Sequence, residues 1–108
     1  MSRLELPQGT LDLLVLRVLS AGEMHGWGIA QRLSLLSKEA LQLQEGTLYP
    51  ALYRMEAKGW IASEWASSEN NRRAKYYRLT RVGRKQLAAQ QEMWDRLTAV
   101  VAHVLQRA

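Results

Sequence analysis

The chain has 108 residues, of which 47% are hydrophobic and 23% are charged. This length and composition predict one globular domain and exclude a disordered chain. The absence of cysteine, with two histidines in the whole sequence, excludes a disulfide scaffold and a thiolate metal site, and we expect neither a metal nor a cofactor. No apolar run exceeds four residues. We therefore expect no membrane span, no signal peptide and a cytoplasmic location.

The positive charge is concentrated in one short segment. The formal net charge is +5, yet residues 70–85 contain no acidic residue and seven basic ones, namely Arg72, Arg73, Lys75, Arg78, Arg81, Arg84 and Lys85. Elsewhere acidic residues outnumber basic ones. A localised basic patch indicates a polyanionic partner such as nucleic acid, and the alternative is a solvated charged face.

Two helices are predicted in the first third of the chain. Apolar residues recur at helical spacing from Leu11 to Leu19, with Thr10 as the N-cap and Gly22 just beyond the end. A second helix is expected from about Gly28, with an apolar stripe through Ile29 and Leu33. His25 stands beside Gly26 without a second metal-ligating residue nearby. We assign it a structural role in capping or packing.

A third helix is predicted over residues 46–58. It begins near Thr47, so that Pro50 falls within the first turn, where it is tolerated. One stripe, formed by Leu48, Leu52 and Met55, is expected to face the core. A second stripe cannot point into the same core and consists of Thr47, Pro50, Ala51, Arg54 and Lys58.

The pattern changes after Gly59. Residues 60–66 and 75–79 are rich in aromatic and branched side chains and predict two strands, joined by turn residues that include Asn70 and Asn71. Tyr76 and Tyr77 must point to opposite faces, and Tyr77 is expected in the core with Leu79. Thr80 is predicted to cap a last helix over residues 81–106, roughly 40 Å long.

This order of elements is typical of a mainly α fold with a small β-hairpin. It predicts a winged helix-turn-helix DNA-binding domain over residues 1–80 and a C-terminal dimerisation helix over residues 81–108. In such a domain the third helix enters the major groove of double-stranded DNA, and the hairpin, or wing, reaches the adjacent backbone.

Several blocks resemble the PadR family of bacterial transcriptional regulators. They follow one another in order from about Gly9 to Leu87, as Gly9-Thr10-Leu11, His25-Gly26-Trp27-Gly28-Ile29, Gly46-Thr47-Leu48-Tyr49-Pro50-Ala51-Leu52 with Arg54 and Glu56, Gly59-Trp60-Ile61, Lys75-Tyr76-Tyr77, and Leu79-Thr80 with Gly83. Trp27 stands where the family more often has tyrosine, and Asn70-Asn71 where glycine is common at the wing tip. The single C-terminal helix is similar to that of the compact branch of this family. The resemblance implies a homodimeric repressor that binds a roughly palindromic operator and releases it when a small aromatic or phenolic effector binds.

The residues expected to contact DNA lie on the third helix and the wing. They are Thr47, Tyr49, Pro50 and Arg54, and Arg72, Arg73, Lys75 and Tyr76. The wing cations are expected to meet phosphates or the minor groove. The alternatives are that Arg54 and Glu56 make only surface pairs, and that Tyr49 or Tyr53 packs on the core. We favour DNA contact for Arg54 and packing for Tyr53.

The last helix carries a heptad-like seam. Leu87, its first member, is expected to pack on the first helix, and the rest to form a dimer interface through Trp94, Leu97, Val101, Val104 and Leu105. His103 is expected to border this interface. Trp94 could also stack on a planar effector across the dimer, or serve only as an interface anchor.

Two other classes of function were weighed. A winged helix can be a protein-interaction module without specific DNA binding, but the basic wing argues against it. A small enzyme is disfavoured because no acid–base pair, nucleophile pair or phosphate-binding loop is evident.

Overall fold

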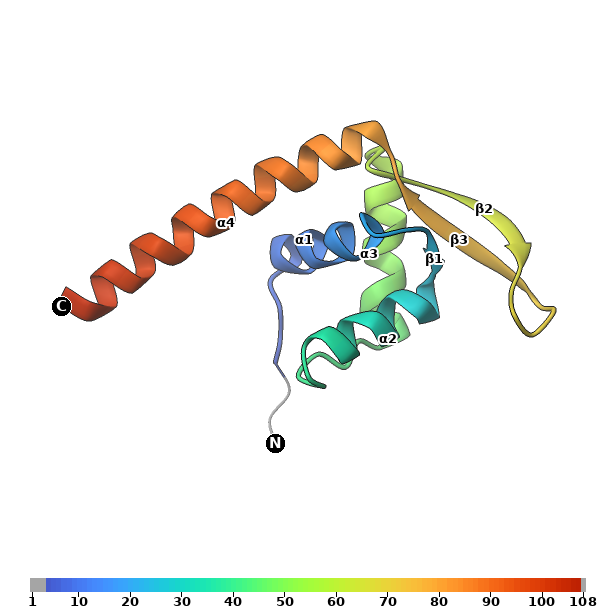
Figure 1. Ribbon diagram of the computed structural model, residues 1–108, viewed down its shortest axis with the longest axis horizontal. Helices are drawn as coiled ribbons and strands as arrows, with labels where there is room; N and C mark the ends of the chain where they lie inside the picture. The colour runs from blue at the N-terminus through green and yellow to red at the C-terminus, as the bar shows by residue number, and fades with distance from the viewer. Residues whose placement is uncertain (1–3, 108) are drawn as a thin grey trace.

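The computed structural model describes residues 4–107, which form four helices and a three-stranded sheet (Figure 1). Residues 1–3 of the predicted DNA-binding domain and residue 108 of the predicted dimerisation helix lie outside the described residues. In chain order the elements are α1 (Gln8–Leu19), β1 (Met24–His25), α2 (Gly26–Leu36), α3 (Glu45–Ala57), β2 (Ile61–Ser67), β3 (Arg73–Leu79) and α4 (Arg81–Arg107). A mainly α winged-helix fold with a long last helix is thus confirmed.

The core lies around α1, which packs against α2, α3, β3 and the start of α4. Its apolar side chains meet those of α2 and α3, and the most deeply buried members are Val15, Leu16, Ile29, Leu52 and Met55. Burial of such side chains is the main favourable term in folding. The core therefore holds the three helices in one unit.

Three helix starts differ from the predictions. Helix α1 begins at Gln8 with Pro7 as its N-cap, so Thr10 lies inside the first turn. Helix α2 begins at Gly26, because the Nδ1 atom of His25 accepts a hydrogen bond from the Gly28 amide at 2.9 Å. The predicted capping role of His25 is confirmed.

Helix α3 begins at Glu45, two residues before the predicted start. Pro50 therefore lies in the second turn, where it has no N–H to donate to the carbonyl of Gly46. Gly46 is exposed, so water can satisfy that carbonyl.

The sheet has the order β1–β3–β2 and is antiparallel throughout. Tyr77 and Leu79 of β3 are buried, as predicted. The hairpin turn places Asn71 at a φ of 60°, the left-handed conformation expected of asparagine there. Strand β1 was not predicted because two residues are too few to show a periodicity.

Helix α4 starts tightly against the turn between α3 and β2 and then leaves the body (Figure 1). The Thr80 hydroxyl accepts a hydrogen bond from the Gly83 amide at 3.0 Å, which confirms the predicted cap, and donates toward the carbonyls of Gly59 and Trp60. Gly83 and Leu87 are the buried residues of α4, and every residue from 91 to 107 is exposed.

Candidate nucleic-acid interface

The outer face of α3 is built from side chains that the core does not take. Thr47, Tyr49 and Pro50 are exposed on the first two turns, as expected of a DNA-facing surface. Two predictions for this helix are wrong. Ala51 is 4% exposed, since it packs with the core, and Tyr53 is 78% exposed because it lies one turn beyond Tyr49 on the same outer face.

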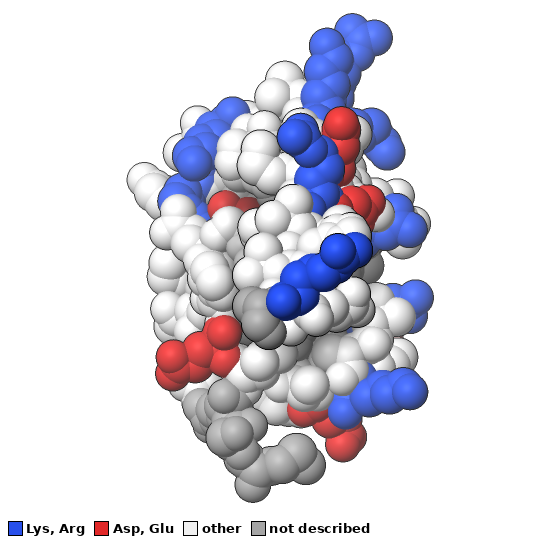
Figure 2. All heavy atoms as spheres, turned by 90° about the vertical axis from the view of Figure 1, so that its left-hand side faces the viewer, with Lys and Arg blue, Asp and Glu red and all other residues white. Residues whose placement is uncertain are grey.

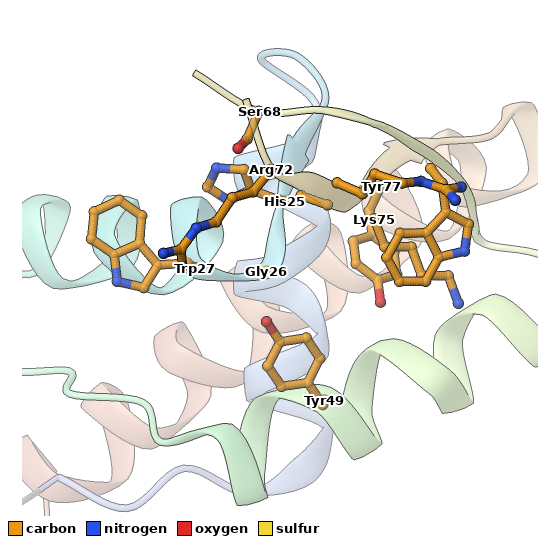
Figure 3. A pocket seen from close by; sticks show the side chains of 11 residues that line it. His25, Gly26, Trp27, Tyr49, Ser68, Arg72, Lys75 and Tyr77 are labelled. Carbon is orange, nitrogen blue, oxygen red and sulfur yellow. The ribbon is translucent and has the colours of Figure 1, made fainter. Parts of the chain in front are cut away.

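Tyr49 is held against the start of α2. A Cβ atom at Gly26 would lie 2.6 Å from the Tyr49 hydroxyl and 2.8 Å from two ring carbons. The missing side chain of Gly26 therefore makes room for this ring, which stands between α3 and the start of α2 in Figure 3. Tyr49 remains 41% exposed.

The wing and the starts of α2 and α3 enclose an open cleft of about 530 Å³ (Figure 3). It is lined by aromatic and basic side chains and contains no acidic residue, the lining being His25, Gly26, Trp27, Tyr49, Trp65, Ser68, Arg72, Arg73, Ala74, Lys75 and Tyr77. Of the predicted DNA contacts, Tyr49, Arg72, Arg73 and Lys75 come together here. A cationic, aromatic concavity suits a sugar–phosphate backbone.

The cations of the cleft are held in different ways. Lys75 Nζ lies 3.6 Å from a carboxylate oxygen of Glu56, whose other oxygen accepts a hydrogen bond of 2.6 Å from the Ser63 hydroxyl. This pair ties the wing to α3. Arg73 lies over the Trp65 ring at 5.5 Å and is exposed, so its charge stays available to a phosphate.

Tyr77 also lines the cleft. Burial, reinforced by the charge of Glu56, raises the pKa of the Tyr77 phenol above its ordinary value. Tyr77 is therefore a neutral hydroxyl at physiological pH.

Tyr76 is not among the residues that line the cleft, although it packs on one of them. Its ring is 5.3 Å from that of His25, which pairs with it across strands β1 and β3. The prediction that Tyr76 and Tyr77 occupy opposite faces of β3 is thus consistent with their surroundings, and Tyr76 is half-buried.

Arg54 points toward α1. Its Nη2 atom donates to the Asp12 Oδ1 atom at 2.6 Å, and 26% of its side chain is exposed. The sequence predicted contact with DNA, with a carboxylate pair as the alternative. The structure places Arg54 in such a pair, although the partner is Asp12 and not Glu56.

Sequence reasoning missed Asp12, Trp27 and Trp65. Asp12 carried a signal, because an acidic residue inside the apolar run of α1 must find a buried partner. Trp27 and Trp65 are 64% and 59% exposed. Exposed large aromatic side chains that lie close together are typical of a contact surface.

The basic surface is uneven when the molecule is viewed from the C-terminal end of α4. Figure 2 shows Lys and Arg atoms at the top, near the centre and along one edge of the outline, with Asp and Glu atoms beside some of them. In residues 4–107 no cluster of His, Asp and Glu could hold a metal ion, and no helix is long and apolar enough to cross a membrane.

Helix α4 presents a second surface. All the predicted interface residues are exposed, from 41% for Trp94 to 75% for Leu105, and Met93 and Val100 extend the same apolar face. Between α1 and α4 lies an open cavity of about 390 Å³, lined by Pro7, Gly9, Thr10, Leu13, Gln86, Ala89, Gln90, Met93, Trp94 and Leu97. The buried Gln90 Oε1 atom has no hydrogen-bond partner within the described chain.

Comparison with known proteins identifies the family. A model of the transcriptional regulator PadR-like family matches residues 15–89. The chain belongs to the PadR-like family. A transcriptional regulator of Mycobacterium tuberculosis is 31% identical over 97 residues, covering 90% of this chain and 87% of that protein.

Solved structures agree with this assignment. A transcriptional regulator from Clostridium thermocellum has a TM-score of 0.81 and 30% identity, covering 89% of this chain and 93% of its own. A PadR family regulator from Eggerthella lenta has a TM-score of 0.79 and 31% identity, covering 94% and 86%. As a PadR-like protein, this chain is a DNA-binding transcriptional regulator and not an enzyme.

Proposed function

We propose that this PadR-like protein binds a specific double-stranded DNA sequence through α3 and the wing. The observation that carries the proposal is the exposed outer face of α3 beside an aromatic cleft lined by Arg72, Arg73 and Lys75. Thr47, Tyr49 and Pro50 would meet base edges in the major groove. The wing cations and Tyr76 would contact the DNA backbone. Because bacterial DNA lies in the cytoplasm, a protein that binds it is located there too.

The DNA-bound form is a homodimer joined through α4. Residues 4–80 form the DNA-binding part and residues 81–107 the dimerisation helix. Trp94, Leu97, Val101, Val104 and Leu105 leave a long apolar stripe in water, which a second copy of α4 would cover. Two-fold symmetry then calls for a roughly palindromic operator with half-sites about 10 bp apart.

The regulator acts as a repressor that a small aromatic effector releases. The cavity between α1 and α4 has the size of a ligand site and adjoins the proposed dimer stripe at Trp94 and Leu97. Trp94 offers a stacking face, and the unpartnered Gln90 oxygen can accept a hydrogen bond. Together they suit a planar ring that carries a hydroxyl donor, such as a phenol.

Effector binding is tested by measuring how a series of phenols changes operator affinity. Trp94→Ala is expected to weaken the effector response by about tenfold, and to weaken DNA binding less than that, because the other residues of the stripe still join the dimer. Gln90→Leu should weaken the binding of hydroxylated compounds more than that of the same compounds without the hydroxyl group. Loss of DNA binding with a normal effector response in Trp94→Ala would contradict this role.

DNA binding is tested by fluorescence anisotropy with the duplex immediately upstream of the protein's own gene, against a scrambled duplex, across a salt series. We expect the native duplex to bind at least about a thousandfold more tightly, and both affinities to fall steeply with salt. No binding to either duplex at low salt would instead favour the protein-interaction module.

A further inference from the structure

A partly buried ion pair connects α1 to the proposed recognition helix. Asp12 is 3% exposed, and its Oδ1 atom lies 2.6 Å from Arg54 Nη2. The Arg54 Nε atom is also buried and has no hydrogen-bond partner in the described chain. The guanidinium is thus turned toward α1 and away from the exposed face that carries Tyr49 and Tyr53.

The two ends of this pair adjoin the two proposed binding surfaces. On α1, Asp12 is the neighbour of Leu13, which lines the cavity beneath α4 together with Gly9 and Thr10. On α3, Arg54 follows Pro50 by one turn of helix. The pair is therefore a short route between the cavity and the first turns of α3.

The seam between α1 and α3 is open to solvent along part of its length. A groove of about 320 Å³ runs between them, lined by Leu6, Gln8, Leu11, Thr47, Pro50, Ala51 and Arg54. Where the groove leaves a gap, the directional contact from Arg54 to Asp12 fixes the distance between the helices.

The net contribution of the pair to stability is expected to be small, because burial of the two charges offsets their attraction. Burial raises the pKa of Asp12 above its ordinary value, although Arg54 and Lys58 of α3 both oppose that shift. The fold thus favours a neutral side chain at position 12 more than the unfolded chain does. A neutral isostere there is expected to fold.

We propose that Asp12 and Arg54 are positioning residues, which set the placement of α3 on α1 and transmit occupancy of the α1–α4 cavity to the DNA-binding face. The inference rests on the proposed function and deepens it. It assigns Arg54 a role without contact to DNA, so the charge of Arg54 does not add to the attraction of phosphates.

The test compares Asp12→Asn, Arg54→Met, the double variant and Glu23→Gln. Glu23 is exposed in the turn after α1, and its variant removes one negative charge, as Asp12→Asn does. The probe is the upstream duplex or, if that duplex is not bound specifically, a duplex enriched from a random pool by the parent protein. Affinity for this probe and for a scrambled duplex is measured across a salt series, after circular dichroism and denaturant unfolding confirm the fold.

A positioning pair predicts one pattern. Both single variants lose about tenfold in specific affinity, the double variant loses no more, and Glu23→Gln matches the parent. Affinity for the scrambled duplex and the salt slope stay at the parent values, because no phosphate contact is lost. Bound phenols, where the parent responds to them, change the operator affinity of the single variants less than that of the parent.

Other patterns would overturn the inference. If Arg54→Met lowers the salt slope by about one while Asp12→Asn binds as the parent does, Arg54 contacts DNA directly. Additive losses in the double variant would show that the two residues act independently. If Arg54→Met does not fold, Arg54→Gln replaces it, since this variant also removes the charge and leaves the interpretation of the salt slope unchanged. A parent protein that selects no duplex would overturn the proposed function itself, and this inference with it.

Discussion

Gly26 controls where Tyr49 stands. A methyl group at position 26 would overlap the Tyr49 hydroxyl and ring, and the far end of an exposed side chain can swing away. Gly26→Ala is therefore expected to change the free energy of unfolding by less than about 1 kcal/mol. Affinity for the operator duplex should fall by about 1 kcal/mol, because the displaced ring no longer faces the cleft.

Anisotropy titration and denaturant unfolding measure both effects. Gly9→Ala is the matched control, since a Cβ atom there would meet nothing within 4 Å. If Gly26→Ala bound the duplex as tightly as this control, the placement of Tyr49 would not matter for recognition.

Asp12 predicts a pH dependence of stability. Its folded pKa is raised above the unfolded value of about 3.8, so the folded chain binds the proton more tightly. As pH falls from neutral through the folded pKa toward the unfolded value, protonation of Asp12 adds stability. The free energy of unfolding of the parent should therefore rise relative to that of Asp12→Asn over this window. Urea unfolding at several pH values checks this, and a relative decrease on acidification would show that the pair stabilises the fold.

Contacts between neighbours in sequence could be predicted, and contacts across the chain could not. The caps formed by His25 and Thr80 follow from local turn chemistry, and the burial of Tyr77 follows from strand alternation. Arg54 and Asp12 lie 42 residues apart in sequence. No local rule indicates which carboxylate an arginine will meet, so the prediction of DNA contact for Arg54 rested on the helix stripe and on the family resemblance.

The wing is expected to contribute to affinity for DNA more than to discrimination between DNA sequences. Arg72→Ala and Arg73→Ala should each reduce the slope of log affinity against log salt by about one and weaken native and scrambled duplexes alike. Arg17→Ala, an exposed charge at the end of α1, provides the control. Unequal losses for the two duplexes would mean that these arginines read base edges.

The start of α4 depends on the absence of a side chain at position 83. A Cβ atom there would collide with the Trp60 carbonyl, which is backbone and cannot turn away, and would lie 2.8 Å from a Leu79 methyl carbon. Gly83→Ala should cost about 2–3 kcal/mol of unfolding free energy. Thermal and urea unfolding measure this loss against Val82→Ala, which alters an exposed neighbour. A stability equal to that of the control would show that this junction is loosely packed.

The order of elements was predictable, whereas their first residues were less so. Helix periodicity located α1, α3 and α4, and the shift of the α3 start to Glu45 arose because Pro50 is tolerated in the second turn when the Gly46 carbonyl faces water. The cleft between the wing and the helices is formed by segments that are distant in sequence. Its cations were therefore predicted as DNA contacts, whereas the positions of Trp27 and Trp65 beside them were not.

The unpaired apolar stripe of α4 determines the assembly that we propose. A charge within the stripe should separate the dimer, so Val101→Glu is expected to sediment as a monomer at concentrations where the parent is a dimer. Ala99→Glu places the same charge on the opposite side of the helix and should leave the dimer intact. A dimeric Val101→Glu variant would place the interface elsewhere.

Footprinting of the parent protein on its operator would test DNA recognition and dimerisation together. Two α3 helices carried by one dimer are expected to protect two half-sites related by two-fold symmetry, about 10 bp from centre to centre. Val101→Glu should lose this paired protection at the same protein concentration. A single isolated half-site protected equally by the parent and Val101→Glu would contradict recognition by an α4-joined dimer.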